Sequence, residues 1–181
     1  MAVMIHPSAI VSSQAQLADG CEVGPHCVIN GPVSLGPGVR LLANVHVWGP
    51  VEIGPGTTIY PFACIGFPPQ DFKFSPGMPT AGVRIGSECV IREHVTIHAA
   101  SKTEAPTIVG NKAYMMVGSH MRHDARIGNN VLLINGAMLA GHSTVMDNAT
   151  VGATCGVHQF TRVGRFAFMS GGTAVSMDVP P

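Results

Sequence analysis

Charge is the property that this sequence lacks most. Only 11% of its 181 residues are charged, where an average soluble domain has about 25%, and 10 basic side chains balance 10 acidic ones. A surface that binds nucleic acid or an anionic membrane needs an excess of cations, so neither partner is expected. Because 46% of the residues are hydrophobic, part of the surface is predicted to be covered in an oligomer.

Long apolar runs and paired cysteines are also absent from the sequence. No stretch approaches the roughly 18 apolar residues of a membrane span, and the first residues lack the basic segment of a signal peptide, so no membrane insertion is expected. The five cysteines are odd in number and include no CxxC pair, which favours reduced thiols in a cytoplasmic protein. The length predicts a single domain over residues 1–181.

A period of six residues runs along most of the chain. Counting in sixes gives an aliphatic residue at every step over residues 5–65, 85–97 and 109–175. All 26 positions of this first column are Ile, Leu, Val or Met. The interval does not fit an α-helix, whose apolar positions recur every 3.6 residues.

A second column lies four residues after the first and holds only small or β-branched side chains. Cys21, Cys27, Cys89 and Cys155 belong to it, so we interpret them as small buried apolar residues and not as redox or metal-binding groups. Glycine often follows the first column, where it is expected to relieve a backbone conformation that a β-carbon would strain.

Two inward positions in every six fit a short strand followed by a tight turn. Three such strands close a triangular coil of 18 residues, and the pattern resembles that of the left-handed parallel β-helix proteins, from which the handedness is taken. We therefore predict an all-β, left-handed parallel β-helix of eight to nine coils. Two segments, residues 66–84 and 98–108, break the period and are predicted to be extruded loops, where function is commonly placed.

The nine histidines occupy neither column, so none is expected in the core. Residues 18 apart stack on coils about 4.8 Å apart, which places His123, Gly141 and Gln159 on one edge, with His142 and His158 one residue away. Such a cluster suggests a general base, a metal site or a subunit contact, and the spacing leaves all three open. The residue after His123 is an aspartate, whose carboxylate could fix the imidazole tautomer.

Several segments outside the general repeat resemble one family. They are QDFKF (70–74), VTIH (95–98), SHMRHDARIGNN (119–130), LAGH (139–142), GVHQF (156–160) and DVPP (178–181). Over essentially the whole chain they make the sequence similar to the UDP-N-acetylglucosamine 3-O-acyltransferases that begin lipid A synthesis. The resemblance implies transfer of an (R)-3-hydroxyacyl group from acyl carrier protein to the 3-hydroxyl of UDP-N-acetylglucosamine, with no metal or other cofactor.

The resemblance also implies roles for individual residues. His123 matches the general base, Asp124 the acid that supports it, and Gly141 the backbone donor to the thioester oxyanion; such a transfer needs a base with a pKa near 7 and a preorganised donor. The positions that match the nucleotide-sugar and acyl-phosphopantetheine sites are Asp71, Lys73, His98, His142, His158 and Gln159. Gly171 matches the position that limits acyl-chain length.

The family works as a homotrimer with its sites between prisms, so a homotrimer is expected here. Two features depart from the family pattern. Ala99 and Ala100 follow VTIH where the family commonly has Arg-Gly, so one basic contact is expected to be lost. The family continues past DVPP into a helical C-terminal domain, whereas the sequence given stops at Pro181 and no segment of it has a helical period, so either a truncated chain or a reduced relative is expected. Carrier binding is therefore predicted to be weak.

Three other functions remain open. A metal enzyme like the carbonic anhydrases of this fold would use three histidines, but His94, His98, His120 and His123 do not have that branch's spacing. A non-catalytic trimeric scaffold would fit the missing domain. A related acyltransferase could use coenzyme A or an amino-sugar acceptor. Metal analysis and a comparison of carrier-bound with coenzyme-A-bound donors would discriminate among these functions.

Overall fold

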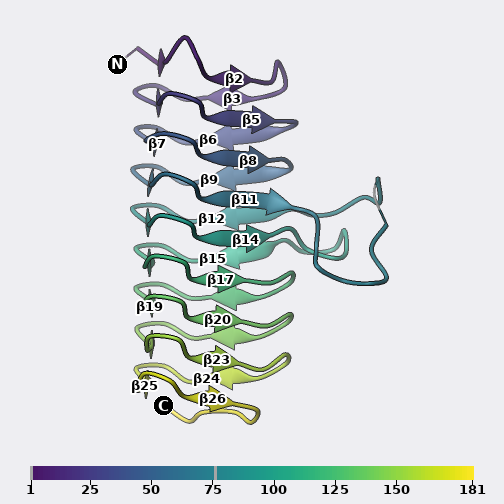
Figure 1. Ribbon diagram of the computed structural model, residues 1–181, viewed down its shortest axis with the longest axis vertical. Helices are drawn as coiled ribbons and strands as arrows, with labels where there is room; N and C mark the ends of the chain where they lie inside the picture. Colours follow the sequence, from purple (N-terminus) through teal and green to yellow (C-terminus); the bar gives the residue numbers. More distant parts are fainter. Residues whose placement is uncertain (1, 76) are drawn as a thin grey trace.

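The computed structural model describes residues 2–75 and 77–181, which form a long stack of coils (Figure 1). Every strand pairs in parallel with the strand three places further along the chain, and this divides the strands into three sheets, here called faces 1, 2 and 3. No helix among the described residues has the length and apolarity of a membrane span.

The three faces contain nine, nine and eight strands, in agreement with the predicted eight to nine coils. Face 1 consists of β1 (Met4–Ile5), β4 (Glu22–Val23), β7 (Arg40–Leu41), β10 (Thr58–Ile59), β13 (Val90–Ile91), β16 (Tyr114–Met115), β19 (Leu132–Leu133), β22 (Thr150–Val151) and β25 (Phe168–Met169). Face 2 consists of β2 (Ile10–Val11), β5 (Val28–Asn30), β8 (His46–Trp48), β11 (Cys64–Phe67), β14 (Thr96–His98), β17 (His120–Met121), β20 (Met138–Leu139), β23 (Gly156–Val157) and β26 (Ala174–Val175). Face 3 consists of β3 (Gln16–Leu17), β6 (Val33–Leu35), β9 (Val51–Ile53), β12 (Val83–Ile85), β15 (Thr107–Val109), β18 (Arg126–Ile127), β21 (Thr144–Val145) and β24 (Arg162–Val163).

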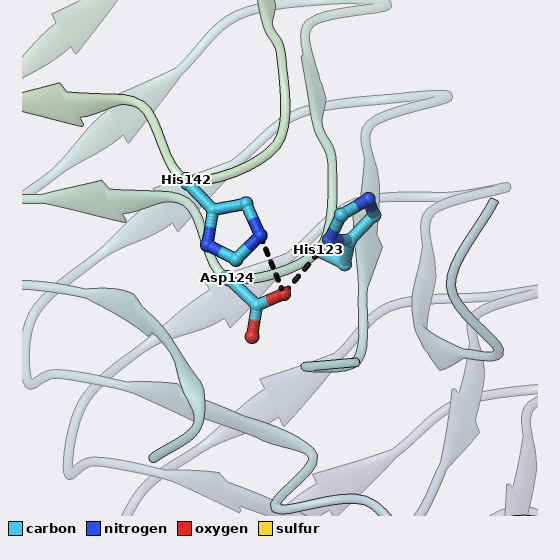
Figure 2. Close-up of side chains that lie close together, drawn as sticks. All are labelled: His123, Asp124 and His142. Atoms are coloured by element: carbon cyan, nitrogen blue, oxygen red, sulfur yellow. Dashed lines mark hydrogen bonds and ion pairs between the residues drawn. The ribbon is translucent and has the colours of Figure 1, made fainter. Parts of the chain in front are cut away.

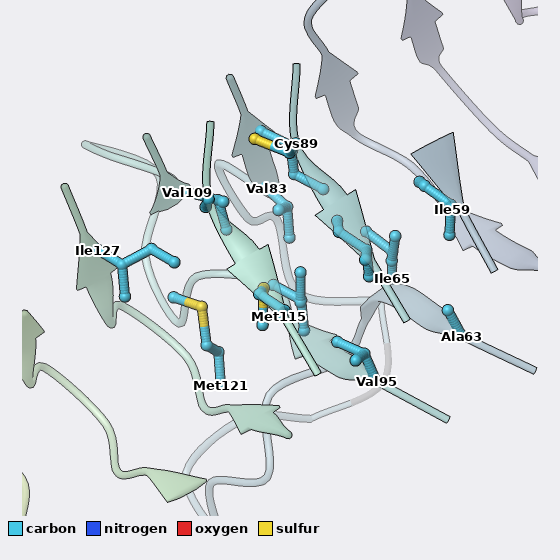
Figure 3. Close-up of a cluster of buried hydrophobic side chains, with 14 of the residues drawn as sticks. Ile59, Ala63, Ile65, Val83, Cys89, Val95, Val109, Met115, Met121 and Ile127 are labelled. Atoms are coloured by element: carbon cyan, nitrogen blue, oxygen red, sulfur yellow. The ribbon is translucent and has the colours of Figure 1, made fainter. Parts of the chain in front are cut away.

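Both sequence columns point into the prism and form its core (Figure 3). The first column supplies the large side chains of the core, such as Ile65 and Met121, and the second supplies small ones that let three strands meet. Burial raises the pKa of the Cys21 and Cys89 thiols, as expected for inert core cysteines. The first coil is less buried than those in the middle of the stack, because only one neighbouring coil packs on it, and its first-column residue Ile5 is 48% exposed.

The corners between faces correct the expected role of glycine. Apart from Gly66, whose φ is 81°, the glycines that directly follow the first column do not have a left-handed backbone. They are needed because the next coil passes close by, and a β-carbon on Gly24 would lie 1.6 Å from the Leu42 carbonyl oxygen. At most corners the left-handed residue is the third of the three corner residues that follow a first-column position. Asp124 and His142 both occupy it, each with φ of 60°.

The two insertions are shorter than the sequence suggested. They cover residues 68–82, between β11 and β12, and 99–106, between β14 and β15, because the strands continue into both predicted loops. Both leave the prism at the corner from face 2 to face 3, so they project from the same side (Figure 1). They are tied together where the Ala100 amide donates to the Gly82 carbonyl at 3.0 Å and the Ala81 amide to the Lys102 carbonyl at 2.8 Å.

Candidate active site

The corners that lead from face 2 to face 3 form one edge of the prism, here called the site edge. Strands β17, β20 and β23 pair in 18-residue register. As a result His123, Gly141 and Gln159 are the second corner residues of successive coils. Asp124 and His142 are third corner residues. The register thus brings the candidate base, its carboxylate and the candidate oxyanion donor to neighbouring coils.

His123 is buried, with 6% of its surface exposed, although it belongs to neither inward column. The ring does not enter the aliphatic core. It lies against the corner of the next coil, where a β-carbon on Gly141 would be 2.7 Å from Cε1 and 3.0 Å from Nε2 of the imidazole. Gly141 therefore makes the space that His123 occupies.

The Asp124 carboxylate pairs with this imidazole. Its Oδ2 lies 2.8 Å from His123 Nδ1 and also accepts the Ser101 hydroxyl at 2.7 Å. Burial alone would raise the pKa of Asp124, but the hydrogen bonds from Ser101 and His123, together with the charge of a protonated His142, outweigh burial and hold the pKa below its usual value. An ionised carboxylate accepts from Nδ1–H, which leaves the lone pair of His123 on Nε2.

His142 stands on the other side of the carboxylate (Figure 2). Its Nε2 is 3.6 Å from Asp124 Oδ2, and its ring meets the His123 ring edge-on at 5.4 Å between centroids. Phe160 stacks on this ring at 4.7 Å between centroids, with the two planes 6° apart. The His142 ring is therefore held by contacts with Asp124, His123 and Phe160, while 32% of its side chain stays exposed.

Within the part of the chain that the structure describes, the same three side chains form a group that could hold a metal ion. One ligand atom from each of His123, Asp124 and His142 can be chosen so that all lie within 4.8 Å of one another. However, the separation of 2.8 Å between His123 Nδ1 and Asp124 Oδ2 is a charge-assisted hydrogen-bond distance. A cation bound between these atoms would replace that bond. The geometry fits an acid–base pair better than a set of metal ligands.

A second pair of histidines lies on face 2, with His120 on β17 in the coil of His123 and His98 on β14 in the coil before it. His98 and His120 meet edge-on at 5.3 Å, and His98 Nδ1 lies 2.7 Å from the Pro68 carbonyl of the long insertion. Burial is the largest cause that lowers the pKa of both rings, that of His120 to about 4; the positive charge of Arg122 contributes in both cases, and for His120 it comes after the charge of a protonated His98. Both rings are therefore neutral at physiological pH, and Arg122 itself donates to the Gln70 carbonyl.

A groove of about 550 Å³ runs along face 2 beside these rings. Its walls include Gln70, His120, Met138, Gly156, His158 and Ala174. The small side chains at its centre leave an apolar trough, whose size is that of a site for a small organic ligand. The groove therefore brings an apolar surface close to the site edge.

Some of the sequence-predicted residues are not brought to His123 by this chain alone. The Asp71 carboxylate turns onto its own loop and accepts the Lys73 amide at 3.0 Å, while Lys73 is exposed. Gly171 follows β25 and lies on the edge between faces 1 and 2, a different edge of the prism. By contrast, Ser101 was not predicted although it contacts Asp124. It lies in an insertion where the six-residue period gives no register, so no sequence signal could have identified it.

In the coils that carry the candidate site, the second corner amides of the site edge are not used by the stack. The amides of His123, Gly141 and Gln159 donate to none of the residues described in 2–75 and 77–181. The neighbouring corner amides do take part in the stack, as when the His142 amide donates to the His123 carbonyl at 3.2 Å. The Gly141 N–H thus lies next to the His123 ring with its hydrogen-bonding capacity unused.

Comparison with known proteins gives a consistent result. The bacterial transferase hexapeptide family (six repeats) matches residues 32–66. The chain is 49% identical to an acyl-[acyl-carrier-protein]–UDP-N-acetylglucosamine O-acyltransferase of Janthinobacterium and 51% identical to one of Alkalilimnicola ehrlichii; each match covers 98% of this chain and 68% of the relative. A match to the Agrobacterium fabrum enzyme is 43% identical and covers 69% of this chain and 46% of that relative.

Solved structures agree with these sequence matches. The UDP-N-acetylglucosamine acyltransferase of Francisella novicida superposes with a TM-score of 0.95 at 39% identity, over 98% of this chain and 64% of the other. That of Moraxella catarrhalis gives a TM-score of 0.92 at 34% identity, over 96% and 67%. The predicted left-handed β-helix is confirmed. The chain spans about half to two thirds of the length of these proteins.

Proposed function

Because the chain belongs to the family of acyl-[acyl-carrier-protein]–UDP-N-acetylglucosamine O-acyltransferases, we propose that it transfers an (R)-3-hydroxyacyl group from acyl carrier protein to the 3-hydroxyl of UDP-N-acetylglucosamine. The single observation that carries the proposal is the buried His123–Asp124 pair, whose lone pair on Nε2 lies beside a free backbone donor. A hydroxyl is a weak nucleophile at neutral pH, and such a pair is what its attack on a thioester requires.

The reaction follows from the two partners of His123. Nε2 takes the proton of the sugar 3-hydroxyl while its oxygen bonds to the thioester carbonyl carbon, and Asp124 balances the charge of the imidazolium. The Gly141 N–H donates to the carbonyl oxygen as it becomes an oxyanion. When the carbon–sulfur bond breaks, the imidazolium returns the proton to the departing phosphopantetheine thiol. The ester is formed without an enzyme nucleophile, a metal or another cofactor.

The remaining predicted residues are assigned to substrate binding. These are Asp71, Lys73, His98, His142, His158 and Gln159, with the acyl chain in an apolar groove that ends near Gly171. Since Gly171 lies on a different edge from His123, the proposal requires a homotrimer in which a second copy brings that edge to the site. We also propose that residues 1–181 are one β-helix domain and that the protein acts in the cytoplasm, where acyl carrier protein is found.

The test is an assay of acyl transfer with purified protein, UDP-N-acetylglucosamine and 3-hydroxyacyl donors carried on acyl carrier protein or on coenzyme A. We expect an O-acylated product, a preference for the carrier-bound donor, and full activity after dialysis against a chelator. A protein that binds neither substrate would instead be the non-catalytic scaffold. A preference for coenzyme A or for an amino-sugar acceptor would identify the related acyltransferase, and loss of activity on metal removal would contradict the cofactor-free mechanism.

A further inference from the structure

Asp124 stands at the first site-edge corner after the two insertions, and its amide has a different partner from those of the corners that follow. In the following coils, the third corner amide donates to a corner carbonyl of the preceding coil, His142 to His123 at 3.2 Å and Phe160 to Gly141 at 3.3 Å. The coil before Asp124 has no such corner, because residues 99–106 replace it. The Asp124 amide donates instead to the Thr107 hydroxyl oxygen at 2.9 Å.

The same insertion also supplies the partner of the carboxylate. The Ser101 hydroxyl donates to Asp124 Oδ2 at 2.7 Å, and the Ser101 amide lies 3.2 and 3.3 Å from Oδ1 and Oδ2. Together with His123 Nδ1, these donors approach both carboxylate oxygens. The side chain of Asp124 is only 13% exposed, so few water molecules could replace them.

Ser101 is itself held firmly. The two residues before it, Ala99 and Ala100, are fully buried, and their amides donate to the Phe67 and Gly82 carbonyls, each at 3.0 Å. These bonds fasten the short insertion to the base of the long one. The hydroxyl of Ser101 is therefore presented to Asp124 by an ordered backbone and not by a freely moving loop.

We propose that Ser101 is a positioning residue for acyl transfer, which orients the Asp124 carboxylate so that His123 is kept in the tautomer with its proton on Nδ1. The inference deepens the proposed function and rests on it for the link to catalysis. Without the hydroxyl, Asp124 Oδ2 loses its shortest hydrogen bond and the carboxylate can turn away from Nδ1. The proton of His123 then becomes free to move to Nε2, where it blocks proton abstraction.

The test compares Ser101→Ala with wild type by kinetics and by ¹⁵N NMR of labelled histidine, with the His123 signals assigned from a His123→Gln spectrum. We expect kcat to fall between about 10- and 100-fold, as for a misplaced catalytic group, with the KM for UDP-N-acetylglucosamine nearly unchanged. The His123 nitrogens should shift from the Nδ1–H pattern to a mixture of tautomers. Ser101→Thr, which retains the hydroxyl, should keep both kcat and the His123 nitrogen signals close to those of wild type.

Two further variants keep the result interpretable. Ser101→Cys fills the same space with only a weak donor and is expected to follow Ser101→Ala, whereas Thr103→Ala alters an exposed side chain of the same insertion and should match wild type. A folded Ser101→Ala or Ser101→Cys protein with wild-type kcat and an unchanged Nδ1–H signal would overturn the proposal. If the wild-type protein shows no acyl transfer, the proposed function fails. The ¹⁵N signals of His123 in the Ser101 variants still show whether Ser101 sets the tautomer of that ring.

Discussion

The site edge can be compared with the edge between faces 3 and 1, here called the ladder edge. Both edges have corners of three residues, but the amide of the second corner residue has different partners on the two edges. On the ladder edge, the amides of Asn111 and Asn129 each donate to a side-chain oxygen of the residue 18 positions later, at 2.9 and 2.8 Å. On the site edge, the amides of His123, Gly141 and Gln159 donate to none of the residues that the structure describes. A donor that is already satisfied by the stack could not serve a ligand.

Free amides are not sufficient to make a site. On the edge between faces 1 and 2, the second corner amides of Asn135 and Gly171 also donate to none of the described residues, and within that part of the chain this edge has no paired imidazole and carboxylate. What distinguishes the site edge is that both insertions leave the prism there and cover the corner of His123. The comparison therefore indicates that the repeat supplies the donors and the insertions supply the burial and the orientation of the reacting groups.

The largest effect is expected from His123→Ala, which removes the base that the ladder edge lacks. Acyl transfer should fall by about 10² to 10⁴, the usual contribution of a general base. Because the ring is buried and hydrogen-bonded, some loss of thermal stability should accompany it. Turnover close to that of wild type in a folded His123→Ala protein would exclude this residue as the base. Asp124→Asn should cost less, since an amide can still orient the ring.

The second prediction tests whether Gly141 makes space for the base. In Gly141→Ala the new β-carbon would lie 2.7 Å from His123 Cε1, so the ring must move, and a displacement of about 1 Å can cost about 100-fold in rate. Asn135→Ala is the matched control, since it changes the same turn position on another edge and should leave kcat unaltered. Equal activity of the two variants would show that the contact between Gly141 and His123 has no part in catalysis.

The stability of the protein should also depend on pH through His120, which lies on face 2 beside the site edge. Folding lowers the pKa of His120 to about 4, mainly through burial, so the folded state binds fewer protons than the unfolded state between that value and the usual pKa near 6.5. Stability is therefore fully present above pH 6.5 and is lost as the pH falls towards 4, by an amount on the order of 2 kcal/mol. Urea titrations at pH 7 and pH 5 should show this loss, and His120→Gln should reduce it. An identical pH dependence in the variant would contradict the assignment.

The smallest effect is expected on the ladder edge. Asn129→Ala removes the acceptor for the Asn111 amide, an exposed hydrogen bond worth about 1 kcal/mol. The free energy of unfolding should fall by about that amount while kcat and KM remain those of wild type. A marked loss of activity without loss of stability would show that the ladder edge contributes to the reaction at the site edge.

Much of the fold could be predicted because each coil repeats the same pattern of inward-facing and corner residues. The two inward columns identified the strands, the core and the role of Cys21 and Cys89. The glycine argument was partly wrong, because the sequence shows which residue follows a strand but not how closely the next coil passes. The burial of His123 was missed for a similar reason, since its ring is covered by Gly141 and by an insertion that the period does not place.

The sequence by itself determined the prism and the edge on which His123, Gly141 and His142 stack, since an 18-residue coil converts spacing in the chain directly into position in space. Only the tertiary structure decided that His123 is enclosed, that its Nδ1 faces the Asp124 carboxylate, and that Ser101 and Thr107 hold Asp124. These contacts depend on residues 99–106, which interrupt the repeat. A periodic sequence specifies the coils that obey its period, whereas the path of an insertion is set by the surface on which it packs.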